Sequence, residues 1–314
     1  MNIILCFHEV KNIEWFENLI VLLKKKFKMI SIWELEQFYK GKLPLHKTCH
    51  ITVDDGELSF YNNIFPILKK HHVPATLFVS PLICRDASNF WFQDLDDLNE
   101  ETLIKQVNKL NIFPEKSIRN GVDVKWALKC LPIRVILNVI NDTRLLHPQR
   151  SGPRNINLSQ LLEIAEYELI EIGAHTLNHP ILSNEDDKTS NYEISESIHL
   201  LESILRQKIH FFAYPNGIPG IDFNRREINF LRKNGIKLAF STEPKILSRK
   251  SNPLSIPRLS ISYGNISFII IKIFLFRYWN SISLLWRPGY RWRKKFIELS
   301  RVSINKGLQD ENYI

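Results

Sequence analysis

The sequence has few cysteines and no arrangement that would make them a site. Its 314 residues include four cysteines, which lie far apart and form no Cys-x-x-Cys pair. A thiolate zinc site and a dense disulfide framework are therefore not expected. Internal repeats and low-complexity segments are also absent from the sequence. With 44% hydrophobic and 24% charged residues, the composition is typical of a folded protein with one large domain or two small ones.

Long apolar runs are lacking as well. None reaches the roughly 18 residues that a membrane-spanning helix needs, and the nearest candidate, residues 266–276, is short and contains Lys272. Met1 leads directly into apolar residues, without the basic segment and small-residue cleavage site of a signal peptide. We therefore expect a cytoplasmic protein, with a peripheral position at the inner face of the membrane as the alternative.

The net charge of +9 is concentrated towards the C-terminus, where the stretch from Lys272 to Arg301 has eight basic residues and one acid. Cations and aromatic side chains are mixed there, so residues 266–296 could lie against an anionic membrane. A helix that packs on the domain and leaves a solvated basic edge is the alternative. Nucleic acid is not expected as a partner, because no recognition motif accompanies the charge.

Short segments rich in Ile, Val and Phe alternate with helical patterns along much of the chain. The segments predicted to be strands are residues 3–7, 50–53, 75–79, 169–172, 211–214 and 237–240. Amphipathic helices are predicted at residues 15–27, 64–70 and 192–205. This alternation predicts an α/β fold with a parallel sheet or barrel. In such folds the polar residues that follow the strands meet at one edge, where sites are built.

Two stretches do not fit the alternation. Residues 85–150 carry an acidic run and the aromatic triplet at 90–92, which could stack on sugar rings or form the core of a subdomain. The segment after residue 262 is basic and rich in aromatics. We predict a barrel over residues 1–262 with a helical insertion at about 85–150, followed by a helical extension over 263–314.

Two polar motifs that follow predicted strands carry the chemistry. Asp54 and Asp55 end one strand, and Gly56 lets the chain turn. His175 and His179 are four residues apart, a spacing that suits a divalent metal if the segment turns helically. Each motif alone is also common as a solvated turn or a packed pair. Together they provide one carboxylate and two imidazoles for an open catalytic metal site, with a second carboxylate available as general base.

These motifs resemble those of the NodB-type polysaccharide deacetylases, carbohydrate esterase family 4, in the bacterial branch that contains FAYPxG. The matching stretches are LCFHEV at 5–10, TVDDG at 52–56, VPATLFV at 73–79, HTLNH at 175–179 and FAYPNG at 212–217. They follow the order of the family and span about residues 3–260. The resemblance implies a distorted (β/α) barrel and a metal-dependent hydrolase. Its substrate would be an N-acetylated amino sugar in a glycan or a glycan precursor, with a lipid-linked sugar as one form.

The resemblance also implies roles for individual residues. Asp54 would act as general base for the attack of a metal-bound water, and the metal would be held by Asp55, His175 and His179. Zinc is the expected metal, and cobalt or nickel would suit the same ligands. Substrate and oxyanion contacts would come from the backbone N–H of Tyr214, from Pro215, which shapes the groove, and from His8 at the mouth.

The chain departs from the family pattern in two places. It has no histidine after His210, although many members use a late histidine as general acid. Arg258 lies in that region and could stabilise charge, but it is a poor proton donor. His8 is therefore the first candidate for the acid, and metal-bound water is the alternative. Tyr214 stands where many members have an arginine that orients the base.

Two alternatives stay open because of these departures. The first is a catalytically impaired carbohydrate-binding protein of the same fold. The second is an amidase or deformylase that acts on another sugar amide.

Overall fold

The computed structural model describes residues 1–314 except 115–116, 149–151, 244, 284–293 and 300–314. The chain forms two compact units. The first consists of residues 1–88 and 153–280, and the second of residues 89–152 and 281–314. The extension predicted from residue 263 is therefore divided between the two units.

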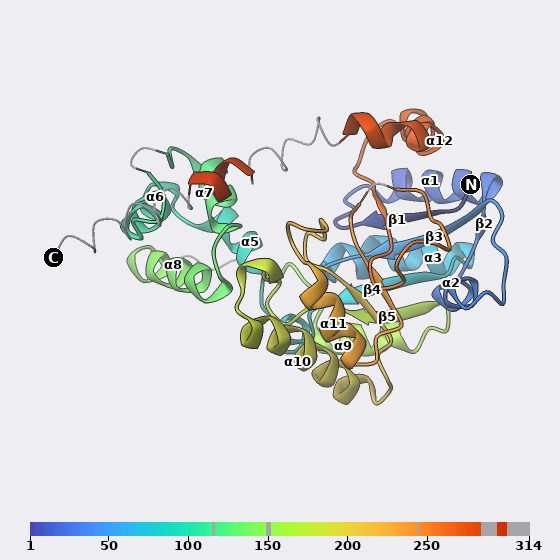
Figure 1. The fold of residues 1–314 in the computed structure, drawn as a ribbon, viewed down its shortest axis with the longest axis horizontal. Helices are drawn as coiled ribbons and strands as arrows, with labels where there is room; N and C mark the ends of the chain where they lie inside the picture. Colours follow the sequence, from blue (N-terminus) through green and yellow to red (C-terminus); the bar gives the residue numbers. More distant parts are fainter. Residues whose placement is uncertain (115–116, 149–151, 244, 284–293, 300–314) are drawn as a thin grey trace. The chain divides into compact units, whose positions relative to one another are not determined.

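The first unit contains a curled sheet of eight parallel strands (Figure 1). The strands are β1 (Ile3–Phe7), β2 (Lys28–Met29), β3 (Thr48–Val53), β4 (Ala75–Val79), β5 (Ile170–Ala174), β6 (Phe211–Ala213), β7 (Leu238–Phe240) and β8 (Leu259–Ser260). Their order is β7-β6-β5-β4-β3-β1-β8, with β2 beside β3. Between β7 and β8 the chain returns alongside β7 through a parallel bridge between Phe240 and Ile256. This arrangement confirms the predicted distorted (β/α) barrel.

Helices surround the sheet of the first unit. They are α1 (Ile13–Lys26), α2 (Ile32–Tyr39), α3 (Phe65–His71), α4 (Pro81–Asp86), α9 (Leu158–Ala165), α10 (Asp187–Leu205), α11 (Arg225–Lys233) and α12 (Ile266–Ser283). Several are capped by a side chain that accepts a backbone N–H of the first turn, as Ser31 does for α2 and Asp186 for α10. The predicted start of α10 was five residues too late, because its first turn is polar and shows no apolar periodicity.

Apart from β2 and β8, the strands are largely buried on both faces, and successive side chains belong to different cores. In β1, Ile3, Leu5 and Phe7 pack in a large core with the surrounding helices, whereas Ile4 belongs to a second cluster. Phe78 of β4 belongs to that second cluster as well. This period of two is the pleat of a strand. Because both faces are covered, these strands appear in the sequence as continuous apolar runs instead of alternating ones.

A buried polar side chain beside the second cluster has hydrogen-bond partners within the fold. His50 of β3 is fully buried, with Nδ1 lying 2.8 Å from the Ile30 carbonyl oxygen and Nε2 3.0 Å from the Thr76 hydroxyl. Burial lowers the pKa of His50 to about 4, so its imidazole is neutral. Because both ring nitrogens have a partner, this histidine supports the fold and is not a ligand.

One strand boundary differs from the prediction for a clear steric reason. The predicted strand ended at residue 172, but β5 continues through Gly173 to Ala174. A Cβ placed on Gly173 would lie 2.4 Å from the ring of Phe78 and 2.9 Å from the Phe211 carbonyl oxygen. The glycine is therefore present because the Phe78 ring packs directly on the strand, and not because the chain turns there.

The second unit is helical and has its own core. Its helices are α5 (Trp91–Asp94), α6 (Glu100–Lys109), α7 (Gly121–Leu128) and α8 (Ile133–Leu146). Trp91 is 2% exposed within this core, so the packing interpretation of the aromatic triplet fits it better than sugar stacking. Phe296, from the helical residues 294–299, is buried in the same core. Among the described residues, no helix is both long enough and apolar enough to cross a membrane.

Candidate metal centre and active site

The predicted site residues follow three strands of the sheet. His8 comes directly after β1, Asp54 and Asp55 come after β3, and His175 comes after β5. Because β1, β3, β4 and β5 are parallel neighbours, these positions lie at the same edge of the barrel. Residues separated by more than a hundred positions in the chain are thereby placed beside one another.

The three predicted ligands lie close together. Asp55 Oδ1 is 3.4 Å from His175 Nε2 and 3.4 Å from His179 Nε2. One ligand atom from each residue lies within 4.8 Å of the other two, and all three side chains are buried. Burial acts to raise the pKa of Asp55, but the two imidazoles outweigh it and hold that pKa well below its usual value. A charged carboxylate and two imidazole nitrogens therefore face a common point.

These residues fit a divalent cation. Asp55 Oδ1 is buried and accepts no hydrogen bond from the described residues, which is costly unless a cation lies beside it. His175 Nδ1 lies 2.7 Å from the Ala213 carbonyl oxygen, so this nitrogen carries the proton and donates it there. The lone pair is then on Nε2, which points to the common site. A backbone acceptor of this kind is the usual support of a metal-binding histidine.

Left-handed backbone conformations shape the same region. Asp55, Thr176 and His179 have φ values of 71°, 64° and 55°, which non-glycine residues rarely adopt. Side chains of adjacent strand residues normally point to opposite faces. The turn at Asp55 breaks that alternation, so Asp54 and Asp55 both reach the site. Strain of this kind persists where surrounding contacts hold it, and it is common at functional sites.

Glu193 holds the turn that carries the two histidines, and the sequence analysis did not identify it. Its carboxylate accepts hydrogen bonds from the backbone N–H groups of Leu177 (3.0 Å) and Asn178 (2.9 Å) and from the Asn178 amide (2.7 Å). Burial raises the pKa of Glu193 despite these donors. The available signal was its position on α10, in phase with the buried Ile194 and Leu201.

Arg258 forms a buried two-point ion pair with Asp54. Its Nη1 and Nη2 atoms each lie 2.7 Å from one oxygen of the carboxylate, and the side chain of Arg258 is 0% exposed. The guanidinium also donates to the Thr52 hydroxyl and to the Ser241 carbonyl. Arg258 therefore orients the carboxylate, which is the role that the family resemblance gives to an arginine in the position of Tyr214.

The pair with Arg258 determines the charge of Asp54. Burial acts to raise the pKa of Asp54, but Arg258 outweighs it and keeps that pKa below the usual value. Burial lowers the pKa of an arginine, yet here Asp54 outweighs it and the pKa of Arg258 rises. Arg258 thus stays protonated and cannot serve as a proton donor.

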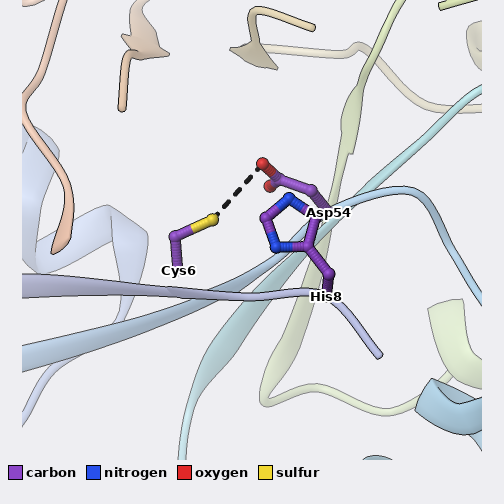
Figure 2. Close-up of side chains that lie close together, drawn as sticks. All are labelled: Cys6, His8 and Asp54. Carbon is purple, nitrogen blue, oxygen red and sulfur yellow. Dashed lines mark hydrogen bonds between the residues drawn. The ribbon is translucent and has the colours of Figure 1, made fainter. Parts of the chain in front are cut away.

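Cys6 and His8 complete the surroundings of Asp54 (Figure 2). The Cys6 thiol donates to Asp54 Oδ2 at 3.4 Å, and burial raises the pKa of Cys6 so that the thiol stays protonated. His8 is exposed, and one of its nitrogens lies within 4.8 Å of the carboxylate. These three residues are a poorer cation site than the first set, because both oxygens of Asp54 already accept hydrogen bonds from Arg258.

The oxyanion role predicted for the Tyr214 backbone does not fit the structure. Its N–H already donates to the Phe240 carbonyl at 3.1 Å, because the pairing of β6 with β7 continues one residue past the strand. The hydroxyl donates to the Leu254 carbonyl, and the ring stacks on Phe223 with 3.5 Å between centroids. Tyr214 is a core residue, and Pro215 beside it is also buried.

Comparison with known sequences defines the class of this protein. The family described as "Polysaccharide deacetylase" matches residues 42–109 and 148–239, just over half of the chain. The chain therefore belongs to the polysaccharide deacetylase family, which confirms the resemblance seen in its motifs.

Individual relatives agree with this assignment. The chain is similar to the poly-β-1,6-N-acetyl-D-glucosamine N-deacetylases of Staphylococcus epidermidis (24% identical over 223 residues) and Staphylococcus aureus (26% over 223 residues). Each match covers 71% of this chain but only 57% of the relative. The chain thus spans little more than half the length of these curated relatives.

Solved structures share the fold. IcaB from Ammonifex degensii matches with a TM-score of 0.57 and 17% identity, covering 86% of this chain and 95% of that one. The deacetylase PplD of Streptococcus pyogenes, solved in complex with acetate, matches with a TM-score of 0.55 and 18% identity, over 86% of this chain and 96% of that one. The similarity therefore extends over most of the chain.

The pair of Arg258 with Asp54 makes a prediction about stability. Arg258→Met leaves a buried carboxylate without its partner and should lower the free energy of unfolding by about 3–5 kcal/mol. In an Asp54→Asn background the same substitution should cost far less, since no charge is left unpaired. Urea unfolding of the four proteins in this cycle measures the coupling. Additive losses would contradict the pairing, and Arg85→Met, in an exposed pair with Asp86, serves as the control.

The hydrogen bonds of Glu193 make a prediction about metal affinity. Glu193→Ala leaves two backbone N–H groups of the histidine turn unpaired and should weaken zinc binding by about 10–100-fold. Glu193→Gln should recover part of this loss, because the Asn178 amide can turn to match it. Competition with a chromophoric chelator measures the affinity. The control is Glu196→Ala on the same helix, and equal zinc affinity in the two alanine variants would rule out this role for Glu193.

Proposed function

We propose that this protein removes an N-acetyl group from an amino sugar of a glycan or glycan precursor, with the help of a divalent cation. The observation that carries the proposal is the pairing of two sites at one edge of the barrel. One is the buried ligand set of Asp55, His175 and His179, and the other is the Asp54 carboxylate held by Arg258. Membership of the polysaccharide deacetylase family and the names of its relatives support the same chemistry.

The cation would be held by Asp55, His175 and His179, a ligand set that suits zinc first, with cobalt or nickel as alternatives. When bound, it supplies Lewis acidity to polarise the amide carbonyl and to make water more acidic. The protein fixes the tautomer of His175 through the Ala213 carbonyl, and Glu193 supports the turn that carries both histidines.

Asp54 would act as general base and take a proton from the attacking water. A base must be ionised to do so, and Arg258 keeps it ionised. Oδ2 accepts from both Arg258 and Cys6, whereas Oδ1 accepts only from Arg258 among the described residues. A carboxylate oxygen can accept about two hydrogen bonds, so we assign proton acceptance to Oδ1.

His8 would supply a proton to the departing amine. It is exposed beside Asp54 at the mouth of the barrel (Figure 2), and an imidazole can give and take protons near neutral pH. Arg258 occupies the region of the late histidine of the family but is fully buried against the base. In this proposal the general acid is therefore His8, near the start of the chain.

The two alternative functions inferred from the sequence have less support, and experiments on the reaction must distinguish them from deacetylation. A carbohydrate-binding protein without activity has no need for a buried arginine that orients a carboxylate beside a metal site. An amidase or deformylase would use the same residues and differ in the shape of its pocket. The poly-β-1,6-N-acetyl-D-glucosamine of the staphylococcal relatives and a lipid-linked sugar are both candidate substrates.

Substitution of the base tests the reaction. Asp54→Asn should reduce acetate release from N-acetylglucosamine oligomers by about 10²–10⁴-fold in the presence of zinc, while zinc content stays unchanged. Asp86→Asn, at an exposed position, should leave the rate intact. Acetate release that survives in Asp54→Asn would refute the proposed base. Zinc binding without acetate release from any N-acetylated sugar would favour the binding protein.

Substrates with different leaving groups test whether His8 is the general acid. His8→Gln should slow acetate release from N-acetylated sugars, because the departing amine needs a proton. It should leave the hydrolysis of p-nitrophenyl acetate nearly unchanged, since p-nitrophenolate leaves without one. Rates for both substrates with zinc-loaded protein give the comparison. Equal slowing of the two reactions would show that His8 is not the acid.

A further inference from the structure

Helix α12 has one face in the core and one face in solvent, and both are apolar. Ile269, Ile270 and Ile273 are at most 8% exposed and pack on the main core of the first unit. On the other side, the side chains are exposed: Phe268 by 64%, Ile271 by 51%, Phe274 by 48% and Leu275 by 47%. A surface helix of a water-soluble domain normally carries polar residues on its outer side.

The exposed side chains form one continuous strip. At 3.6 residues per turn, positions 268, 271, 274 and 275 fall within about a third of the helix circumference, and Ser267 is the only polar exposed residue among 267–275. The strip continues into the preceding loop, where Tyr263 is 72% exposed. Exposed apolar patches of this kind mark surfaces that bind a partner.

The strip is held firmly by the barrel. The ring of Phe274 stacks on Phe27 at the end of α1, with 5.9 Å between centroids. At the other end the Trp15 indole donates to the Gly264 carbonyl at 2.7 Å, and its ring lies 5.4 Å from that of Tyr263. Helix α12 therefore lies beside α1 (Figure 1), and its orientation relative to the first unit is determined by packing.

Lysines at the end of α1 lie near one end of the apolar strip. The last turn of α1 consists of Lys24, Lys25 and Lys26, all exposed. Lys26 Nζ lies 5.7 Å from the centre of the Phe274 ring, so the positive charge is directly beside the strip. Lys24 Nζ donates to the His71 carbonyl at the end of α3, whose last turn is also basic.

We infer that the outer face of α12, together with the lysines at the end of α1, is a docking surface for an anionic phospholipid bilayer. A helix that lies in the plane of the interface inserts its apolar side chains at the boundary of headgroups and acyl chains. Lysines at its border then face the lipid phosphates. We assign a membrane surface as the occupant instead of a protein groove, because the lysines at the end of α1 place positive charge beside the aromatic and aliphatic strip. This inference does not depend on the deacetylation reaction.

Binding to vesicles tests the inference with the full chain. The protein should sediment with vesicles of phosphatidylcholine and phosphatidylglycerol and much less with phosphatidylcholine alone, and added salt should weaken the binding. Replacing two residues of the strip, in Phe268→Gln/Ile271→Gln, should reduce the partition coefficient by about tenfold or more. Leu162→Gln, at an exposed leucine of α9, is the matched control and should bind as the wild type does.

A second variant keeps the test valid if the first one fails to fold. Lys25→Gln/Lys26→Gln leaves the apolar strip intact and should reduce binding to the anionic vesicles while leaving weak binding to neutral ones unchanged. The inference is overturned if wild-type protein does not sediment with anionic vesicles, or if both double variants bind as tightly as the wild type. A dimer in solution that dissociates in Phe268→Gln/Ile271→Gln would instead identify the face as an interface between copies of the chain.

Discussion

The buried ion pair of Asp54 and Arg258 is the interaction on which the site depends. Two charges removed from water are stable only if they satisfy each other closely, and here both carboxylate oxygens meet the guanidinium at 2.7 Å. The partners are 204 residues apart in the chain. They meet only because β8 pairs with β1, which in turn pairs with β3. The pair therefore couples the pairing of strands β8, β1 and β3 to the charge and orientation of the Asp54 carboxylate, the proposed base.

Two adjacent carboxylates have different surroundings and therefore different chemistry. Asp54 continues the inward direction of β3 and is held by Arg258 and Cys6. The left-handed backbone at Asp55 turns the next carboxylate towards His175 and His179. One carboxylate has hydrogen bonds on both oxygens, and the other has a buried oxygen that accepts no hydrogen bond from the described residues. The proposed general base and the proposed metal ligand can thus be neighbours in the chain without competing for the same partner.

Much of the fold and part of the site could be predicted from local patterns. Strands β1 and β4 begin and end at the predicted residues, because mostly apolar runs of five residues, bounded by polar residues or proline, leave little ambiguity about where a strand begins and ends. The motif order indicated the family and the candidate ligands. Strands β2 and β8 escaped prediction because two residues carry no periodicity. The capped polar turn that starts α10 escaped for a similar reason.

The sequence by itself determined the residue types at the ends of the strands, and with them the class of chemistry and the (β/α) barrel. Only the tertiary structure decided which of those residues act together. Arg258 pairs with Asp54, the Tyr214 N–H donates to the Phe240 carbonyl, and Glu193 supports the histidine turn. These partners depend on strand register and on which face of a helix is buried. Such relations join distant parts of the chain, and no local pattern of residues encodes them.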